Sequence, residues 1–407
     1  MEKCETVGTS NRIYTLLLAC LISCFFIFES SSWSSLSVIG VTAALLLAYA
    51  IGKRGRLRLR LTAYHSRIGI FVVYSFMTAL WSWSSSATIS RSTTVLFNFL
   101  CMAVVYMIYG DGGSLEDYFR AIMLSGIIIS LYTVSFVGLD NLKYATEAKG
   151  RIEGDEFYAS INAMGMWMSV CTIVFVHRIL NTKFKPWYLL GVFPVVMIAV
   201  AQSRTALIEA VLGVVLVFIF KTRNSKRVSK KLGNFVVGIL VMVGVFYAVT
   251  QMDIFAGLYN RMRSIFGLST VHKEGSMVLR SSMIEIGLDQ FKKTPIFGIG
   301  VGASRVLTKT YLSLSTYLHN NFVEMLACGG MVGFLLYYSV HWYVLKNLWK
   351  AKAFRKPDLQ LCMLLMIIHV LGDYGTVSFY KKPTYVIITL GYLAVAMARR
   401  GEGTHEE

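Results

Sequence analysis

Long apolar runs recur from one end of the chain to the other, separated by short polar or basic segments. Runs of about 17 or more apolar residues with few charges are long enough to cross a bilayer as helices. The pattern predicts about twelve spanning helices, centred near Leu18, Ala44, Val73, Val105, Ile128, Val170, Val195, Val214, Val241, Phe334, Met366 and Leu393. The sequence therefore predicts an all-α polytopic membrane protein with one integral domain over residues 1–407. A very apolar soluble α-protein is the alternative.

Prolines are scarce in the predicted spans: of five in the chain, only Pro194 lies within one. Because proline is a common cause of a break in a helix, helices broken at the midplane of the membrane have little support. No internal repeat is evident either, which argues against a transporter built from inverted halves.

The positive charge follows the loops between the predicted spans. The chain has a net charge of +18, and basic residues cluster at 53–60, 221–231 and 346–356. These clusters fall in alternate loops, as the positive-inside rule describes for the cytoplasmic side. We therefore expect both termini in the cytoplasm and two longer segments, 139–160 and 251–320, on the outer side. Charge distributed in this way gives no reason to expect nucleic acid as a partner.

The large outer loop, 251–320, carries periodic apolar residues and is predicted to be partly helical. Residues 254–266 fit an interfacial helix on anionic headgroups or a helix packed on the domain. A second helix has an apolar face at Met283, Ile284, Gly287, Leu288 and Phe291. Arg280 belongs to the same face, where an unpaired charge is costly. It therefore needs an anionic partner, either a bound anion or a carboxylate such as Glu324 or Glu209.

A glycine run follows this helix. Pro295 ends the helix, and Gly298, Gly300 and Gly302 come next. The run is not a P-loop, because no strand precedes it and no Gly-Lys-Ser/Thr follows. The main interpretation is that these glycines let the backbone follow a tight path. The alternative is that the backbone N–H groups cradle a phosphate.

The stretch Y-L-H-N-N-F-V-E at 317–324 joins the polar loop to an apolar helix. His319 is its one residue that exchanges protons near neutral pH, and it stands beside a helix start, where unpaired N–H groups favour anions. Neutral imidazole can take a proton from an attacking hydroxyl. The arrangement suggests chemistry on a lipid phosphate at the membrane surface, and a structural histidine is the alternative.

The predicted topology gathers unusual polar residues on the outer side of the membrane. The candidates are Arg151, Arg204, Glu209, Arg280, His319, Asn320, Glu324 and Asp373. Arginine presents a planar fork to phosphate oxygens and stays charged, so three arginines with one histidine suit a diphosphate leaving group. Carboxylates inside a membrane are functional hypotheses by default, and Glu209 and Glu324 are two of them, unless they pair with Arg204 or Arg280 for structure alone. Histidines and cysteines lack zinc-ligand spacing, and neither a metal nor another cofactor is expected.

These elements resemble the O-antigen polymerase and O-antigen ligase superfamily of bacterial glycan-assembly enzymes. The residues that carry the resemblance are A-Q-S-R-T-A-L at 201–207, the R-x4-E helix from Arg280 to Glu285, P-I-F-G-I-G at 295–300, and His319-Asn320 followed by Gly330 and Gly333. K-G-R-I-E-G at 149–154 with Asn162, and G-D-Y at 372–374, add to it. The resemblance covers most of residues 140–385.

The resemblance implies a GT-C-like arrangement of membrane helices with one large outer loop. It implies transfer of a glycan from undecaprenyl diphosphate to a hydroxyl, with inversion and without a metal. Arg204 and Arg280 would hold the diphosphate and His319 would activate the acceptor, whereas Arg151 and Asp373 match the pattern less securely. The run H-N-N-F-V-E-M-L is more similar to polymerases of capsule and O-antigen clusters. We therefore expect a polymerase of such repeat units on the outer face of the cytoplasmic (inner) membrane.

Other functions stay open. An O-antigen ligase, which hands the glycan to lipid A–core or another acceptor, is the main alternative to a polymerase. A transporter or flippase for the same lipid-linked glycan and a non-catalytic scaffold are the others. The expected partners are the undecaprenyl-diphosphate-linked glycan and the lipid bilayer, with a chain-length regulator and a flippase as candidates.

Overall fold

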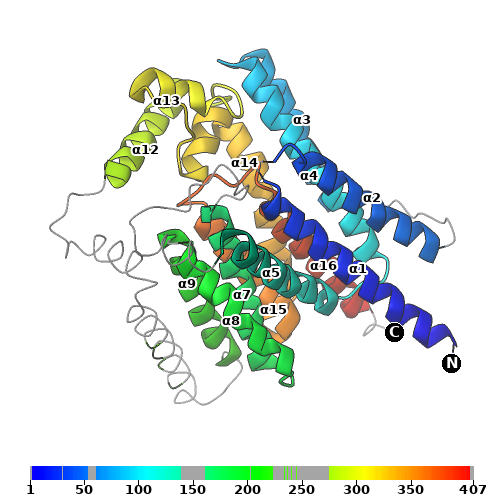
Figure 1. The fold of residues 1–407 in the computed structure, drawn as a ribbon. Coiled ribbons are helices and arrows are strands. Elements are labelled where there is room, and N and C mark those ends of the chain that lie inside the picture. The colour runs from blue at the N-terminus through cyan, green and yellow to red at the C-terminus, as the bar shows by residue number, and fades with distance from the viewer. Residues whose placement is uncertain are drawn as a thin grey trace. The chain divides into compact units, whose positions relative to one another are not determined.

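The computed structural model describes residues 2–29, 31–53, 61–138, 161–201, 203–222 and 275–403, with the single positions 233, 236, 240 and 244. These residues form helices and connecting segments, and no β-strand occurs among them (Figure 1). The all-α prediction is thus confirmed for the described part of the chain. The chain divides into two compact units, the first made of 1–57, 108–270 and 351–368 and the second of 58–107, 271–350 and 369–407. A single integral domain stays a prediction for the chain as a whole.

Several helices have the length and composition of membrane spans. Among the described residues five qualify, namely Ser34–Gly52, Ser85–Gly110, Leu115–Phe136, Asn162–Asn181 and Asn321–Lys350, and Arg12–Ile27, Pro186–Val200 and Pro357–Gly372 are shorter apolar helices. The chain is therefore consistent with a polytopic membrane protein. The number of twelve stays a prediction, and the centre near Val241 lies outside the described residues.

The first unit is built on α1 (Glu2–Ile27), α2 (Ser34–Gly52), α5 (Leu115–Val137), α7 (Ile161–Asn181), α8 (Val192–Val200) and α9 (Arg204–Thr222). Helix α7 packs against α5, α8 and α9, and α1 packs against α2 and α5. A short 3-10 helix, η2 (Pro186–Gly191), contacts α7 and α8. Helix α15 (Pro357–Gly372) begins in this unit, and its last residues belong to the second.

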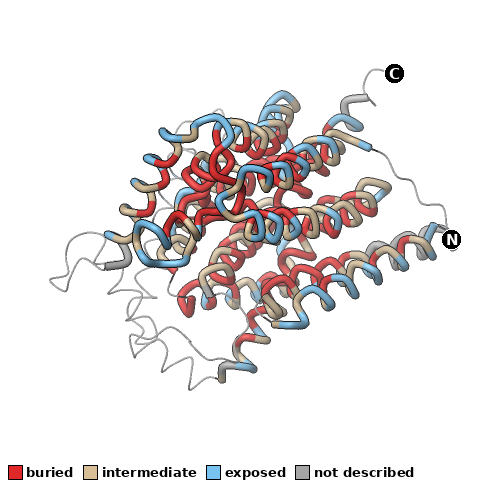
Figure 2. Tube along the Cα trace, turned by 90° about the horizontal axis from the view of Figure 1, so that it is seen from above, coloured by how far each residue is buried: buried red, intermediate tan, exposed pale blue. Residues whose placement is uncertain are grey.

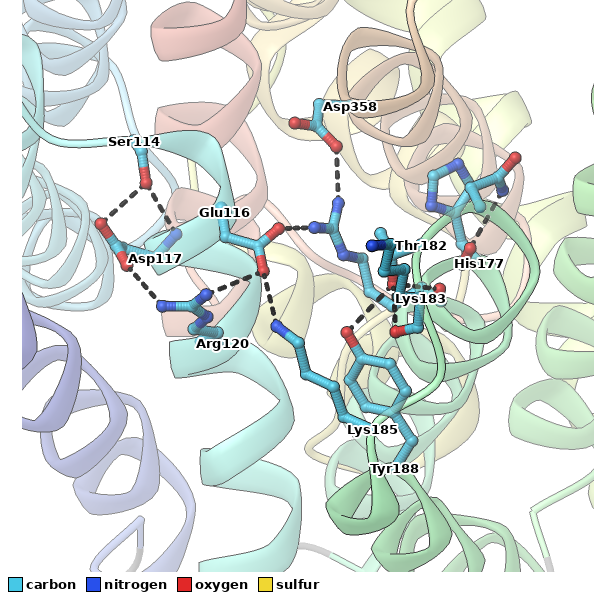
Figure 3. Close-up of polar contacts among 12 residues, drawn as sticks. Ser114, Glu116, Asp117, Arg120, His177, Thr182, Lys183, Lys185, Tyr188 and Asp358 are labelled. Atoms are coloured by element: carbon cyan, nitrogen blue, oxygen red, sulfur yellow. Dashed lines mark hydrogen bonds and ion pairs between the residues drawn. The ribbon is translucent and has the colours of Figure 1, made fainter.

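A network of ion pairs joins the ends of three helices within the first unit. Ser114 caps α5 by accepting a hydrogen bond from the N–H of Asp117 at 3.0 Å, and Glu116 follows in the first turn. The guanidinium of Arg178, at the end of α7, pairs with Glu116 and with Asp358 of α15. Figure 3 shows Glu116 at the centre of this network. Arg178 is only 4% exposed, so its charge requires both carboxylates.

The second unit consists of α3 (Ala63–Met77), α4 (Ser85–Gly110, except its last residues), α12 (Gly275–Lys293), α13 (Ser304–Leu312), α14 (Asn321–Lys350) and α16 (Lys382–Gly403). Helix α14 packs against α3, α12, α13 and α16. Buried and exposed positions alternate along the helices in Figure 2. Exposed large apolar side chains on α14, such as Leu335 and Trp342, are typical of a surface that faces lipid.

Helix α14 is broken at Gly330, where φ is 63° and ψ is −170°. Only glycine adopts this backbone conformation without a large steric cost. The expectation drawn from Pro194 concerns breaks at the membrane midplane and stays a prediction, but the scarcity of proline does not exclude a break in α14. A glycine causes the break, and the loop before α13 stabilises it.

This loop takes over hydrogen bonds on the C-terminal side of the break. In an unbroken helix the N–H groups of Met331 and Val332 would donate to carbonyls four residues earlier. Here Met331 donates to the carbonyl of Pro295 at 2.8 Å, and Val332 donates to that of Ile296 at 3.2 Å. The loop thus supplies the acceptors that the second half of α14 has lost.

The exchange is reciprocal on the N-terminal side. The carbonyls of Ala327 and Cys328, which the break has freed, accept hydrogen bonds from the N–H groups of Ile299 (3.1 Å) and Gly300 (2.9 Å). Four hydrogen bonds between the loop and α14 therefore replace two hydrogen bonds within the helix, and they fix the glycine run against α14. These N–H groups are used within the protein, which supports a backbone path and not a phosphate cradle.

Candidate functional site

The start of α14 is held by Asn320. Its side-chain oxygen accepts a hydrogen bond from the N–H of Val323 at 3.1 Å, and its carbonyl accepts one from the N–H of Glu324 at 2.9 Å. This is the geometry of an N-cap, which satisfies N–H groups that lack partners at a helix start. The predicted helix start after His319 is confirmed. Asn320 is buried, so its side chain holds the helix start from inside the protein.

His319 adopts a left-handed backbone conformation, with φ at 56°. This conformation is uncommon for residues other than glycine, although histidine is enriched among the exceptions. Such strain persists only where the surroundings impose it, and it concentrates at functional sites. The imidazole ring is half-buried and lies 4.2 Å from the ring of Tyr317, measured between centroids. The backbone therefore presents His319 in one defined direction at the entrance of α14.

Glu324 fixes the segment that contains His319. Its Oε2 accepts a hydrogen bond from the N–H of Leu318 at 3.0 Å, and its Oε1 accepts one from the hydroxyl of Ser304 at 2.5 Å. Glu324 is 1% exposed and forms no ion pair with any residue that the structure describes. The alternative in which it pairs with Arg280 is therefore not realised. Its carboxylate instead joins α13, α14 and the segment 317–320.

A second buried network ties the start of α14 to Asp373, in the segment between α15 and α16. The carboxylate of Asp373 accepts hydrogen bonds from Asn321 (3.1 Å), Tyr338 (2.9 Å) and Ser378 (2.5 Å). Asn321 also donates its backbone N–H to the carbonyl of Asp373 at 2.7 Å. Burial raises the pKa of Asp373 to about 7, and the three hydrogen bonds lower it against that effect.

Arg280 lies on α12, as predicted, and is half-buried. The same helix contributes Met283 to a buried apolar cluster that includes Leu318, the neighbour of His319. The buried face runs through Met283, Gly287 and Gln290, at helical spacing. Leu288, which we expected on this face, is 38% exposed. The apolar stripe is thus narrower than the sequence suggested, because the polar Gln290 occupies its last buried position.

Residues 189–338 match the family model described as O-antigen ligase. This stretch of the chain is therefore similar to the O-antigen ligase and polymerase superfamily. The resemblance seen in the sequence is thereby confirmed, and the family indicates a glycan-transferring enzyme. A comparison with curated proteins finds no match.

The match to the superfamily spans six of the candidate residues, in both units of the structure, and Asn320 is one of those in the second unit. Arg204 begins α9 and Glu209 is buried in its second turn, both in the first unit. Arg280, His319 and Glu324 belong to the second unit. Asp373 lies outside the match, and so does Arg151, which is also outside the described residues.

The second unit brings His319, Asn320, Glu324 and Asp373 together around the start of α14. Four residues of this arrangement were not predicted as site residues from the sequence: Ser304, Asn321, Tyr338 and Ser378. For Asn321 a signal existed, since it follows Asn320 at a predicted helix start. Ser304 and Tyr338 gave no signal, because their partners Glu324 and Asp373 lie far away along the chain.

Proposed function

We propose that this protein is a membrane glycosyltransferase that polymerises undecaprenyl-diphosphate-linked oligosaccharide repeat units, of O-antigen or capsule type. It would act on the outer face of the bacterial cytoplasmic membrane, with both termini in the cytoplasm. The superfamily match supports glycan transfer. The main observation that supports the proposed site is the backbone of His319, which is held in a strained conformation between the Asn320 cap and the Glu324 carboxylate.

In the proposed reaction His319 acts as general base on the acceptor sugar. Neutral imidazole takes the proton of the acceptor hydroxyl while its oxygen attacks the anomeric carbon of the donor. The bond between that carbon and the diphosphate oxygen breaks, and the configuration inverts. Arg204 and Arg280 would bind the diphosphate and stabilise the charge that it gains on leaving. These groups supply a base and cations, so the step is written without a metal.

The remaining candidates divide by how their polar atoms are used. Asn320, Glu324 and Asp373 bond mainly to other groups of the protein, so we assign them the support of the site. Arg151 and Glu209 are proposed to contact the diphosphate or the glycan. A flippase that delivers the lipid-linked unit and a chain-length regulator are the proposed protein partners.

Ligation is the second candidate function. The description of the matched family model, O-antigen ligase, favours it. A ligase would use the same base and the same leaving group but would transfer the glycan to lipid A–core or another acceptor. The two functions therefore differ in the acceptor and not in the roles of His319, Arg204 and Arg280.

The deciding experiment supplies the purified protein with lipid-linked repeat units alone and measures the products by mass. A polymerase yields a ladder of multiples, and His319→Ala abolishes it. His65→Gln, which changes a histidine at the start of α3, serves as the matched control and should retain the ladder. Products that form only after lipid A–core is added would establish a ligase. If His319→Ala is as active as the wild type, the assignment of the base is wrong.

A further inference from the structure

Arg91 is a cation of a membrane helix, and no residue that the structure describes forms an ion pair with it. It lies in the second turn of α4, which is a candidate span. The carbon at the centre of its guanidinium is 4.2 Å from the ring centroid of Tyr380. Among the described residues it forms neither a hydrogen bond nor an ion pair. An arginine in a membrane segment normally pairs, because an isolated charge there is costly.

The ring under Arg91 carries a second cation. The Nζ of Lys381 lies 5.5 Å from the centroid of Tyr380, so two positive groups share one aromatic ring. The ring attracts each of them, and one phosphate group that contacts both would interact favourably with both charges.

The position of Tyr380 is fixed by the helix that carries Arg91. Asn98, two turns further along α4 and on the same face, donates a hydrogen bond to the carbonyl of Tyr380 at 2.9 Å. The stem of Arg91 passes against Gly302, where an added Cβ would lie only 2.4 Å from its Cγ. The guanidinium is thus directed by packing on both sides, and the arrangement is built before any ligand binds.

Glu324, a buried acid on which the charge of Arg91 acts, does not form an ion pair with it. Glu324 is close enough for the charge of Arg91 to act on it, but its two oxygens accept hydrogen bonds from Ser304 and Leu318. Arg305 acts on the same carboxylate, which leaves an excess of positive charge in this region. These cations lie near the candidate base, because Tyr380 is within electrostatic reach of Tyr317, whose ring lies 4.2 Å from that of His319 between centroids.

We propose that Arg91, Tyr380 and Lys381 bind a phosphate group of a membrane lipid beside His319. The guanidinium would offer its planar fork to two phosphate oxygens, the ammonium would neutralise the second charge, and the phenol would donate a hydrogen bond. The phosphate comes either from a polyprenyl diphosphate, as in the proposed substrate, or from a phospholipid headgroup. The proposal rests on the proposed function only for the first of these sources.

The test measures binding and needs no turnover. Undecaprenyl diphosphate without a glycan and phosphatidylglycerol are titrated separately against the full-length protein in neutral detergent, and bound lipid is counted by native mass spectrometry. We expect Arg91→Gln to weaken the binding of one of these lipids by about tenfold or more. Arg91→Lys, which keeps the charge but loses the fork, should weaken it less.

A matched control has the same type of contact elsewhere in the unit. The guanidinium of Arg67 lies 4.6 Å from the ring of Tyr343, in the half of α14 that follows the break. Arg67→Gln should leave the binding of undecaprenyl diphosphate unchanged. The melting temperature of each variant shows whether it has folded.

The two titrations show which lipid supplies the phosphate group. Loss of undecaprenyl diphosphate alone assigns the site to the substrate lipid, and loss of phosphatidylglycerol alone assigns it to a structural phospholipid. If folded Arg91→Gln binds both lipids as the wild type does, the proposal is overturned. Because His319→Ala tests the reaction independently, failure of the proposed function would leave this binding result intact.

Discussion

Glu324 accepts a hydrogen bond from the backbone N–H of Leu318, the residue immediately before His319. The distance is 3.0 Å, and the other carboxylate oxygen holds Ser304 at 2.5 Å. Leu318 and Asn320 are thus both fixed, and His319 between them has no freedom to relax its left-handed backbone. A buried acid of α14 therefore holds the backbone on one side of the candidate base.

Removing this acid should reduce turnover more than substrate binding. Glu324→Ala leaves the N–H of Leu318 without its acceptor and lets His319 move, and a shift of about 1 Å at a reacting group can cost about 100-fold in rate. We expect kcat to fall by at least about tenfold while the affinity for lipid-linked substrate changes by less than about threefold. Steady-state kinetics together with direct lipid binding measure the two effects.

Two further variants make this prediction specific. Glu324→Gln keeps one acceptor oxygen and should lie between the wild type and Glu324→Ala. Asp289→Ala removes an exposed acid of α12 that pairs only with Lys292 among the described residues, and it should behave as the wild type. Full turnover by a folded Glu324→Ala protein would show that Glu324 does not position His319.

The break in α14 should tolerate no side chain at Gly330. A Cβ there would lie 2.3 Å from the carbonyl oxygen of Ile296, and its φ and ψ fall in a region that is essentially restricted to glycine. We expect Gly330→Ala to destabilise the protein by about 3 kcal/mol or more. Thermal unfolding in detergent measures the change.

Gly329 provides the control for this substitution. A Cβ at Gly329 would meet its nearest neighbour, Val301, only at 3.8 Å, which is ordinary contact. Gly329→Ala should therefore change the melting temperature little. Equal stability of the two alanine variants would contradict the exchange of hydrogen bonds that we describe between residues 295–300 and α14.

The sequence correctly predicted those features that depend on residues close together along the chain. The apolar period of α12 placed Arg280 on a helix, and the doublet Asn320-Asn321 marked the start of α14. The break at Gly330 was missed, because it depends on the carbonyls of Pro295 and Ile296, which no short-range rule connects to α14.

Partners that are distant along the chain explain the other omissions. Arg91 lies in a stretch rich in serine and threonine and gave no signal, since its significance comes from Tyr380 on a remote segment. The same holds for Tyr338, whose partner Asp373 follows the next helix. A single sequence places helices and suggests site residues, whereas contacts between helices decide which of these residues meet.

The Asp373 carboxyl should make stability depend on pH near neutrality. Its pKa is raised from 3.8 to about 7 by burial, so the folded protein retains a proton that the unfolded chain releases at lower pH. The stability that this group contributes is fully present below its ordinary pKa and is lost as the pH rises through 7. The melting temperature of the wild type should therefore fall between pH 6 and pH 8.

Asp373→Asn isolates this contribution. The variant has no proton to release at position 373, so its melting temperature should fall less over the same pH range. Other groups titrate in both proteins, and only the difference between the two curves reports on Asp373. Parallel curves would show that Asp373 does not titrate near pH 7 in the folded protein.

The ion pairs of Arg178 should stabilise the first unit far more than those of Arg120, although both arginines contact Glu116. Arg178 is 4% exposed and Arg120 is 39% exposed. Removing Arg178 deprives Asp358 of its one ion pair among the described residues, and breaking a buried pair typically costs about 3 to 5 kcal/mol, whereas exposed pairs contribute about 1 kcal/mol or less. Arg178→Gln should therefore lower the melting temperature strongly and Arg120→Gln only slightly.

Added salt should weaken the small effect of Arg120→Gln and leave the large effect of Arg178→Gln nearly unchanged, because solvent ions screen exposed pairs. Comparable losses from both substitutions would mean that burial does not set the strength of this network.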